Sequence, residues 1–433
     1  MKSQAKPLGT VHWRHAAPIF RHPYRGYQRL HARFGPTVAL ARPGRKPLIL
    51  TMDEELAATL LTTHHDALAR PQNIVTGIFR NLVGEGIVSA EGEQWKGRRK
   101  RGNQRIRGAT LEDDQVELLR VCLGELRDDI RGLAGRGVVD LLPAIERFTL
   151  SASIRLVCGI ALERGPEFES IYEAVQKVMF GTQRIADIRR QMFLYSLLPR
   201  ARELVDGPQR RAIGPSVERL AAFEPDSEAR ELLIATYENP STALSWTLSL
   251  LGARPAELAK IRDEVEGLEL IDNPELAIAD IEGLARTGAA IRETLRLRPP
   301  IAYLSRRVIE EIDVDELRIE RGSHVLVVPY CLHHDPERWP EPERYMPERF
   351  LGGAEGSRGG RLWSFGVGAR ACPGTRLALQ LASAALAVIA REVRWTQPAG
   401  RAPAVPTGRF PWNEKSPCWQ RLALAPTRSE AAS

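Results

Sequence analysis

The spacing of apolar and polar residues divides the chain into a strand-rich start, a helical middle and a second strand region. Short apolar runs such as TVALAR and PLILTM lie between about residues 30 and 70 and are typical of strands. Helical periodicity dominates from about 90 to 300. Between 304 and 330, the alternating runs RRVIEEIDV and HVLVVPY predict strands again.

The pattern changes twice more toward the C-terminus. Residues 331–370 are rich in Pro and Gly, so we expect turns there rather than regular structure. From Thr375 on, TRLALQLASAALAVIAREV restores an apolar helical pattern. The chain lacks the regular alternation of strands and helices that a Rossmann fold or a barrel needs. We therefore expect a mainly α fold with small β-sheets, in a single domain over residues 1–433.

The composition is that of a folded protein, with 43% hydrophobic and 27% charged residues. No apolar run near the N-terminus approaches the ~20 residues that a membrane span needs, and no signal-peptide core is present. We therefore expect a cytoplasmic protein without a membrane span. The five cysteines are scattered and form no CxxC pair, which argues against a disulfide framework or a structural zinc site.

The net charge of +7 is compatible with nucleic-acid binding but does not require it. The most basic segment, residues 95–107, carries seven Lys and Arg residues in thirteen positions. A nucleic-acid surface usually interleaves such charges with aromatic residues, and Trp95 is the only one in this segment. We therefore expect a solvated face or a surface for an acidic protein, and no nucleic-acid partner.

The strongest local signal is WSFGVGARACPG, residues 363–374. Gly366 and Gly374 let the backbone turn tightly and approach a flat ligand. Arg370 places a permanent cation two residues before Cys372, and the following helix directs its positive N-terminal end at the same sulfur. Both effects favour a thiolate. A thiolate can ligate iron and push electron density into it.

The spacing of Phe365, Gly368, Arg370, Cys372 and Gly374 resembles the haem-binding loop of the cytochrome P450 family. The resemblance implies the P450 fold, with haem b between the long central helix and the helix after the cysteine loop. Cys372 is then the axial ligand of the iron. The resemblance implies further haem contacts from four residues: Ala235, Phe365, Gly366 and Gly374.

Two further pairs of residues match the family in the expected order. Glu293 and Arg296 are three positions apart and share a helix face, so their charges can meet. With Arg349, which lies in the later run PERF, they correspond to a buried structural triad of the family. Trp95 and Arg99 are four positions apart, and both side chains only donate hydrogen bonds, which suits a carboxylate.

The resemblance implies that Trp95 and Arg99 bind the haem propionates together with two other arginines. One of these is Arg370. The other belongs to the strand after the helix of Glu293, where Arg306 aligns best and Arg307 is the alternative.

The segment LLIATYENPSTALSWTLSLL corresponds to the central helix of the family, where an acid followed by an alcohol is usual. Glu238 keeps the acid, but Asn239 replaces the alcohol and Pro240 follows it. Both Glu238 and Asn239 are candidate catalytic residues. A hydroxyl accepts and donates at one oxygen, whereas an amide does so at different atoms, so Asn239 is a poor proton relay. Either water fills the relay, or the chemistry does not follow the usual route.

The resemblance implies an oxidoreductase enzyme, with a monooxygenase as the leading reading: hydroxylation or epoxidation of an apolar or aromatic small metabolite in specialised biosynthesis. Asn239 and Pro240 keep a second class open, in which peroxide is the oxidant, the substrate relays protons, or a nitrene or oxo group is transferred from an N–O or O–O bond. A haem-thiolate sensor without turnover is the alternative outside enzymes.

The family also indicates the segments of the pocket and the electron source. We expect a separate acidic ferredoxin or flavodoxin, with its reductase, to dock near the basic segment 95–107. Ligand pockets are largely apolar, and the matching segments lie at 74–88, near the centre of the long helix and at 301–304. The expected pocket residues are Ile78, Phe79, Leu82, Val88, Tyr237, Ala302 and Tyr303.

Overall fold

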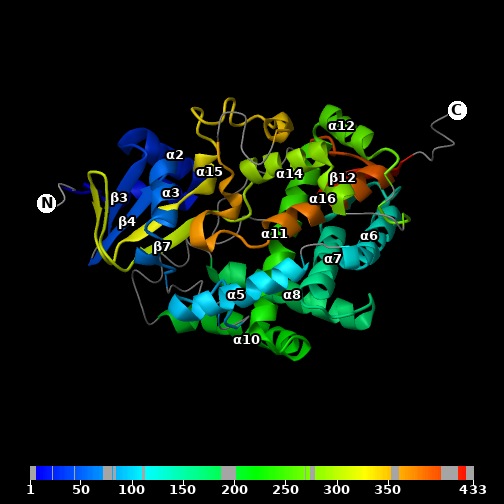
Figure 1. Ribbon diagram of the computed structural model, residues 1–433, viewed down its shortest axis with the longest axis horizontal. Coiled ribbons are helices and arrows are strands. Elements are labelled where there is room, and N and C mark those ends of the chain that lie inside the picture. The colour runs from blue at the N-terminus through cyan, green and yellow to red at the C-terminus, as the bar shows by residue number, and fades with distance from the viewer. Residues whose placement is uncertain are drawn as a thin grey trace.

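The computed structural model describes residues 6–21, 23–42, 44–71, 80, 84–109, 113–186, 201–268, 270–273, 278–352, 360–400 and 418–425. These residues form a helical body with a larger sheet at one end, which is the fold class that the sequence predicts (Figure 1). The helices are α1 (Ala17–Arg21), α2 (Pro23–Phe34), α3 (Glu54–Thr62), α5 (Gly92–Ala109), α6 (Asp113–Leu133), α7 (Leu142–Ala152), α8 (Pro166–Ala186), α10 (Ala201–Phe223), α11 (Ser227–Gly252), α12 (Pro255–Val265), α13 (Ile278–Glu282), α14 (Ala285–Leu297), α15 (Pro329–Leu332) and α16 (Thr375–Glu392).

The described strands form three sheets. The largest has the order β2-β3-β4-β10-β7-β5, and the others have the orders β1-β9-β8 and β11-β12-β6. The strands are β1 (Lys6–Pro7), β2 (Thr10–Val11), β3 (Thr37–Arg42), β4 (Arg45–Thr51), β5 (Leu68–Ala69), β6 (Val138–Asp140), β7 (Leu304–Val308), β8 (Ile312–Val314), β9 (Leu317–Ile319), β10 (His324–Val327), β11 (Val393–Thr396) and β12 (Trp419–Leu424).

The apolar runs of the sequence become the centre of the largest sheet. TVALAR is β3 and the apolar part of PLILTM is in β4. Successive side chains of a strand point to opposite faces: Val38 and Leu50 pack into one hydrophobic cluster, whereas Ala39 and Ile49 pack into another. Both faces of this sheet are therefore covered, and β7 lies between β10 and the edge strand β5.

The long helix α11 passes through the middle of the helical body (Figure 1). Its N-terminus is capped by Asp226, whose carboxylate accepts the amide hydrogen of Glu228 at 2.9 Å. From Tyr237 to Gly252 nearly all of its side chains are buried, because the helix is surrounded by protein. Pro240 lies inside α11 without ending it.

Helix α16 begins directly after the cysteine loop and is as buried as α11 along its inner length. Its apolar residues between Leu381 and Ala390 belong to the largest hydrophobic cluster, together with residues of α6, α7 and α11. In the part of the chain that the structure describes, no helix is both long and apolar enough to cross a membrane.

Candidate functional site

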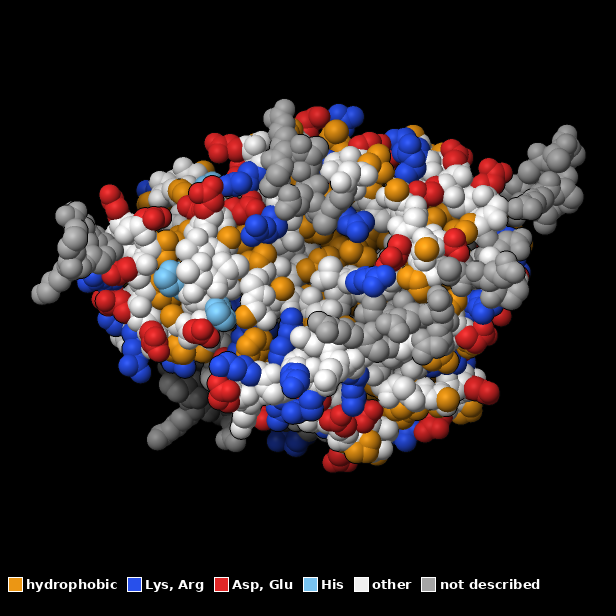
Figure 2. Space-filling model, viewed as in Figure 1, with side chains coloured by type: hydrophobic (Ala, Val, Ile, Leu, Met, Phe, Trp, Pro, Cys, Tyr) orange, Lys and Arg blue, Asp and Glu red, His pale blue; other side chains and the backbone are white. Residues whose placement is uncertain are grey.

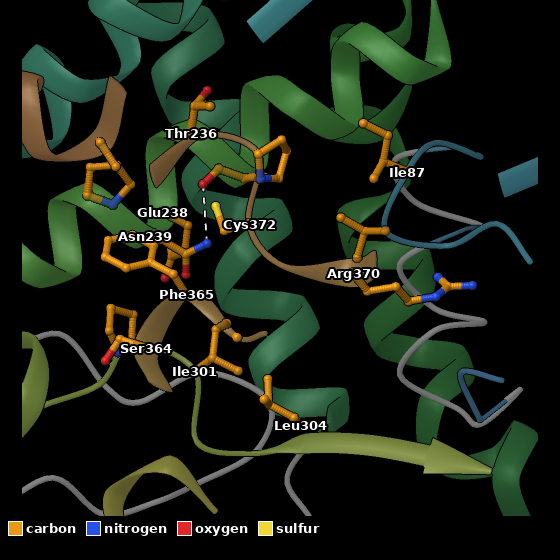
Figure 3. A pocket seen from close by; sticks show the side chains of 18 of the residues that line it. Ile87, Thr236, Glu238, Asn239, Ile301, Leu304, Ser364, Phe365, Arg370 and Cys372 are labelled. Carbon is orange, nitrogen blue, oxygen red and sulfur yellow. Dashed lines mark hydrogen bonds between the residues drawn. The ribbon is translucent and has the colours of Figure 1, made fainter. Parts of the chain in front are cut away.

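A cavity of about 370 Å³ lies between α11, the start of α16, the cysteine loop and β7. Figure 3 shows Thr236, Glu238 and Asn239 of α11 around it, together with Phe365 and Cys372 of the cysteine loop. On the molecular surface, hydrophobic side chains line a depression near the middle of the face in Figure 2, with Lys and Arg side chains around it. Four residues expected beside the haem line this cavity: Ala235, Phe365, Gly366 and Gly374.

The cysteine loop is held in shape by its own backbone. The amide of Cys372 donates to the carbonyl of Phe365 at 2.8 Å. Gly366 and Gly368 have φ of 66° and 74°, in the left-handed region that favours glycine. A Cβ atom on Gly368 would lie 2.0 Å from the carbonyl oxygen of Leu61, at the end of α3. The loop can therefore pack against α3 only with glycine at this position.

Cys372 is the one exposed cysteine among the five, all of which the structure describes. It lines the cavity, so its exposure is to the cavity. Desolvation in the fold raises the pKa of the Cys372 thiol, while the amide of Gly374, the hydroxyl of Thr375 and the charge of Arg99 lower it. Arg99 also donates to the carbonyl of Ala371 at 2.7 Å. The sequence suggested Arg370 as the cation that acts on the sulfur. In the structure this cation is Arg99.

Arg370 instead points to the start of α5. It forms an ion pair with Glu91 at 2.8 Å, and its guanidinium lies 4.2 Å from the ring centroid of Trp95. Trp95 does not line the cavity; its ring lies against the guanidinium of Arg370. Arg370 thus lines the cavity, whereas the indole of Trp95 contacts Arg370 and does not itself line the cavity.

Four arginines line one side of the cavity: Arg70, Arg99, Arg306 and Arg370. Burial, with repulsion from Arg70 and Arg370, lowers the pKa of Arg306 to about 9. Burial and the same kind of repulsion lower the pKa of Arg370 to about 10. The buried Nε of Arg70 has no hydrogen-bond partner. This edge therefore favours anionic groups, which would relieve the repulsion and complete the hydrogen bonds.

Arg70 has no counterpart in the sequence motifs. It follows the short strand β5, which pairs with β7, and so it lies beside Arg306 only because of the sheet order. On β7, Arg306 is 8% exposed and lines the cavity, whereas Arg307 faces outward. Of the two alternatives that the sequence left open, the structure places Arg306 at the site.

These groups fit a flat, apolar molecule with a metal at its centre and acids at its edge. Among the described residues, no group of three or more His, Cys, Asp or Glu could hold a metal ion. Iron in a porphyrin takes most of its ligands from the porphyrin, so a single thiolate such as that of Cys372 is enough on the protein side. The arginine edge matches the carboxylates that such a molecule carries.

The predicted triad comes together behind the cysteine loop. Arg296 contacts Glu293 through two nitrogens, at 2.8 and 2.9 Å, and both side chains are fully buried. Arg349 lies 3.4 Å from the same carboxylate. Arg296 also donates to the carbonyls of His333 and Pro342, at 2.7 and 2.8 Å. The triad thus ties α14 to the turn-rich segment that follows β10.

His333 connects the triad to the cysteine loop, which no sequence motif indicated. The amide of Trp363 donates to its Nε2 at 2.7 Å, so the ring hydrogen is on Nδ1, which bonds to the carbonyl of Arg296 at 2.9 Å. Burial and the charge of Arg296 hold the pKa of His333 well below its ordinary value. The neutral ring therefore fixes the start of the loop against the end of α14.

The α11 wall differs from the usual family pattern in its hydrogen bonds. The amide nitrogen of Asn239 donates to the carbonyl of Ala235 at 3.3 Å, and its Oδ1 is buried without a partner (Figure 3). Thr236 bonds to the carbonyl of Leu232 at 2.8 Å. Pro240 has no amide hydrogen and cannot supply the bond that the Thr236 carbonyl receives in a regular helix. The wall is therefore richer in acceptors than in donors.

The predicted pocket residues divide into three groups. Val88 and Tyr303 line the cavity. Tyr237 and Ala302 do not, contrary to expectation: Tyr237 points to the far side of α11, and Ala302 is packed in the core of the sheet. The remaining three lie outside the described residues: Ile78, Phe79 and Leu82.

Ile87, which the sequence did not single out, closes one side of the cavity. Its side chain occupies a notch on α5, because a Cβ atom on Gly102 would lie 1.9 Å from Cδ1 of Ile87. Ile87 and Leu232 also line a second space of about 240 Å³ beside α5. The shape of this wall thus depends on how closely α5 approaches.

The basic charge of α5 is largely compensated inside the protein. Arg101 and Arg98 lie 2.5 and 3.5 Å from Glu228, and Arg105 lies 3.1 Å from Asp226. These acids are at the start of α11, so the pairs fasten the two helices together. The charge that α5 can offer to an acidic partner is therefore smaller than its number of basic residues suggests.

Comparison with known proteins places this geometry in context. The model of a family described as cytochrome P450 matches residues 7–210 and 224–417. A probable cytochrome P450 4s3 of Drosophila melanogaster is 24% identical over 403 residues, which are 81% of this chain and 78% of that protein. Cytokinin hydroxylase of Arabidopsis thaliana is 24% identical over 392 residues, 82% of this chain and 75% of that protein. The crystal structure of CYP175A1 from Thermus thermophillus superposes with a TM-score of 0.70 and 23% identity, covering 96% of this chain and all of that one, so the two share a fold.

Proposed function

Because the chain belongs to the cytochrome P450 family and is therefore a haem-thiolate oxidoreductase, we propose that it is a monooxygenase that hydroxylates or epoxidises a small apolar or aromatic molecule. The observation that carries the proposal is the cavity in which Cys372 faces the wall of α11 beside four arginines. Haem b bound there supplies the oxygen-activating chemistry. A related protein in the comparison is a named hydroxylase.

We assign the cofactor contacts as follows. Cys372 ligates the iron as a thiolate, which Arg99 and the amide of Gly374 stabilise. The edge carboxylates bind the arginines, with Arg70 added to the three that the sequence indicates. Phe365 packs beside the ligand. Non-covalent binding fits the absence of a CxxC pair in the sequence, since c-type attachment needs one.

The substrate contacts the rest of the cavity wall. Most of this wall is apolar, as expected for a site that takes its ligand mainly by burial of apolar surface. Glu238 and Thr236 add polar groups on the α11 side. The apolar wall consists of Ile87, Val88, Leu232, Ile234, Ala235, Ala243, Ile301 and Leu304.

Asn239 favours a second candidate within the same cofactor class, an oxidation that does not use the usual proton relay. Its amide nitrogen donates one of its two hydrogens to the carbonyl of Ala235. A carboxamide cannot accept and donate at the same atom. In this second reading peroxide is the oxidant, the substrate supplies the protons, or a nitrene or oxo group comes from an N–O or O–O bond.

Electrons for the monooxygenase come from a redox partner, for which we propose an acidic ferredoxin or flavodoxin. The exposed Lys96 and Lys100 of α5 are left for such a surface, although Lys96 lies 2.7 Å from Glu93. Because Arg98, Arg101 and Arg105 are engaged in ion pairs, we expect electrostatic steering by α5 to be modest.

The first experiment tests the ligand. Reduced, haem-loaded protein with carbon monoxide should show the red-shifted Soret band of a thiolate complex, and Cys372→Ser should lose it. Cys331→Ser is the matched control, since Cys331 is buried away from the cavity. An unchanged spectrum in Cys372→Ser contradicts the assignment.

The second experiment separates the two enzyme readings. With styrene as the probe, a monooxygenase incorporates one atom of ¹⁸O₂ into the product and makes none without oxygen and reductant. Product formed at an equal rate under strict anaerobiosis, with hydrogen peroxide as the only oxidant, supports the second reading instead. Asn239→Thr should raise the fraction of consumed reductant that yields product. A sensor would instead show an affinity for a partner that depends on its ligand, and no product under either condition.

A further inference from the structure

Two tyrosines and a carboxylate form a hydrogen-bonded cluster on the side of α11 that faces away from the cavity. Tyr237 has no exposed surface and lies in α11 between Thr236 and Glu238, both of which line the cavity. Its ring packs in the same hydrophobic cluster as Ile234, which also lines the cavity. Tyr237 is therefore separated from the cavity by the thickness of one helix.

The carboxylate of the cluster is Glu146 of α7, which is 5% exposed. The hydroxyl of Tyr172 donates to its Oε2 at 2.8 Å. Gln176 donates to the same oxygen and, at 2.8 Å, to the hydroxyl oxygen of Tyr237. Tyr237 is itself hydrogen-bonded to Glu146. Because the amide nitrogen of Gln176 cannot accept a hydrogen bond, the phenol proton of Tyr237 points to the carboxylate.

Both phenols thus donate to one carboxylate. Burial and the charge of Glu146 raise the pKa of Tyr237 and of Tyr172, so neither phenol ionises at neutral pH. A phenol that loses one electron becomes a strong acid and must release its proton to a nearby base. Glu146 is such a base, already hydrogen-bonded to both rings. The cluster therefore has the arrangement needed for oxidation coupled to proton transfer.

The cluster extends from the buried Tyr237 toward the protein surface. Tyr172 of α8 is half-buried, so the second ring is closer to solvent than the first. The guanidinium of Arg147 lies 4.6 Å from its ring centroid, and that charge is balanced by Glu169 through two contacts of 2.9 Å. Because Glu169 balances the charge of Arg147, the guanidinium does not make oxidation of the Tyr172 ring unfavourable as an unpaired cation would.

We propose that Tyr237 and Tyr172 carry oxidising equivalents out of the haem cavity when no substrate consumes them, with Glu146 as the proton acceptor. The proposal rests on the haem cofactor of the family and is independent of whether the native reaction is a monooxygenation. With hydrogen peroxide as oxidant, each phenol loses one electron and one proton, and the peroxide is reduced to two waters: H₂O₂ + 2 TyrOH → 2 H₂O + 2 TyrO•. A one-electron reductant of the ascorbate class then restores the tyrosines.

The test uses the full, haem-loaded chain without substrate. After mixing with hydrogen peroxide, samples are frozen within a second and examined by electron paramagnetic resonance. We expect a tyrosyl signal in the unmodified protein, a loss of at least fivefold in Tyr237→Phe, and a several-fold loss in Glu146→Gln. In Tyr172→Phe the signal should persist longer, since the outer ring no longer drains the inner one.

Tyr345→Phe is the control, because Tyr345 is also buried but donates to a backbone carbonyl, that of Ala290, at 3.0 Å. Its signal should match that of the unmodified protein. Equal signals in Tyr237→Phe and the unmodified protein would overturn the proposal, as would a loss confined to Tyr345→Phe. The carbon monoxide spectrum of each variant shows that the thiolate-bound haem is intact, so a failure of the tyrosine path is distinguishable from a failure of the proposed function.

A second measurement does not depend on the radical lifetime. With ascorbate present, the half-life of the Soret band under peroxide should fall in Tyr237→Phe and remain unchanged in Tyr345→Phe. Equal bleaching of both variants contradicts the proposal. Melting temperatures of the variants establish that any faster bleaching is not a consequence of partial unfolding.

Discussion

Gly368 shows how strongly a single residue can determine the cysteine loop. Its φ of 74° is unfavourable for any residue with a Cβ atom, and that atom would also collide with the backbone of Leu61. The clash is with a carbonyl, which cannot move away as a flexible side chain can. The position of Cys372 thus depends on a residue that has no chemistry of its own.

We expect Gly368→Ala to lower the free energy of unfolding by about 2–4 kcal/mol, from the strained φ and the overpacking together. Thermal unfolding and the carbon monoxide spectrum check this. Gly352→Ala is the control, since a Cβ atom there meets nothing within 4 Å and φ is not positive; it should change stability by less than about 0.5 kcal/mol. Equal effects of the two substitutions contradict the explanation.

Arg70 gives a second prediction at the level of one side chain. If it binds an edge carboxylate of the haem, Arg70→Gln removes a charge-assisted hydrogen bond of about 1.5–3 kcal/mol and speeds haem loss at least tenfold. Transfer of haem to apomyoglobin measures this rate. Arg318→Gln, on the exposed β8–β9 hairpin, should leave it unchanged. A haem loss rate in Arg70→Gln equal to that of the unmodified protein would sink the assignment.

Single residues also show what the sequence could and could not predict. Cys372, Glu293 and Arg296 belong to short motifs whose geometry is local, so their spacing in the sequence was sufficient to predict that they belong to the site and its support. Arg70 depends on the pairing of β5 with β7, which no local pattern records. Tyr237 was assigned to the wrong face because a helix turns by about 100° per residue, and apolar and polar residues are mixed along this segment, so its sequence does not mark one face.

At the scale of elements, the triad joins α14 to a segment with little regular structure. Glu293 accepts from Arg296 and from the amide of Met346, at 2.9 Å, so a helix and a loop share one buried carboxylate. This carboxylate therefore fixes the turn-rich segment, which has little regular hydrogen bonding of its own, against α14. Because His333 and Trp363 continue this connection, the cysteine loop depends on the same helix.

Breaking this buried pair should be far more costly than breaking an exposed one. We expect Glu293→Gln to lower the free energy of unfolding by about 3–5 kcal/mol, because the charge of Arg296 is then buried with less compensation. Glu257→Gln, which removes an ion pair of the exposed Lys260, should cost at most about 1 kcal/mol. Urea unfolding measures both values, and similar losses in the two variants contradict the role of burial.

At the scale of the whole molecule, stability should depend on buried neutral histidines. Burial lowers the pKa of His334 to about 3, and that of His333 also lies well below 6.5. Below pH 6.5 the unfolded chain binds a proton at each ring that the folded protein does not bind. The folded state is therefore favoured above pH 6.5 and loses stability as the pH falls toward the folded pKa values.

The expected slope is about 1.4 kcal/mol per pH unit for each histidine in this window. Urea unfolding of the haem-loaded protein at pH 7.5, 6.0 and 5.0 measures the slope. His334→Gln should lower the slope by about 1.4 kcal/mol per pH unit, the contribution of one histidine, since glutamine does not titrate. A slope that is the same in the variant, or a stability that does not change below pH 6.5, contradicts this prediction.

The overall architecture was largely readable from the sequence, because its strands and long helices have clear hydrophobic periods. The confirmed strands β3, β4 and β10 and the helix α16 are of this kind. The compensation of the α5 charges was not readable. It requires Glu228 at the start of α11 to approach α5, which is a contact between segments more than 100 residues apart.

The notch at Gly102 has a consequence for how this protein can change. Ile87 forms part of the cavity wall, and its side chain packs against Gly102 of α5, which does not line the cavity. A larger residue at position 102 has no contact with the ligand, yet it must push Ile87 inward and narrow the space. Selectivity can therefore be retuned in evolution, or in the laboratory, from a position that never touches the molecule being selected.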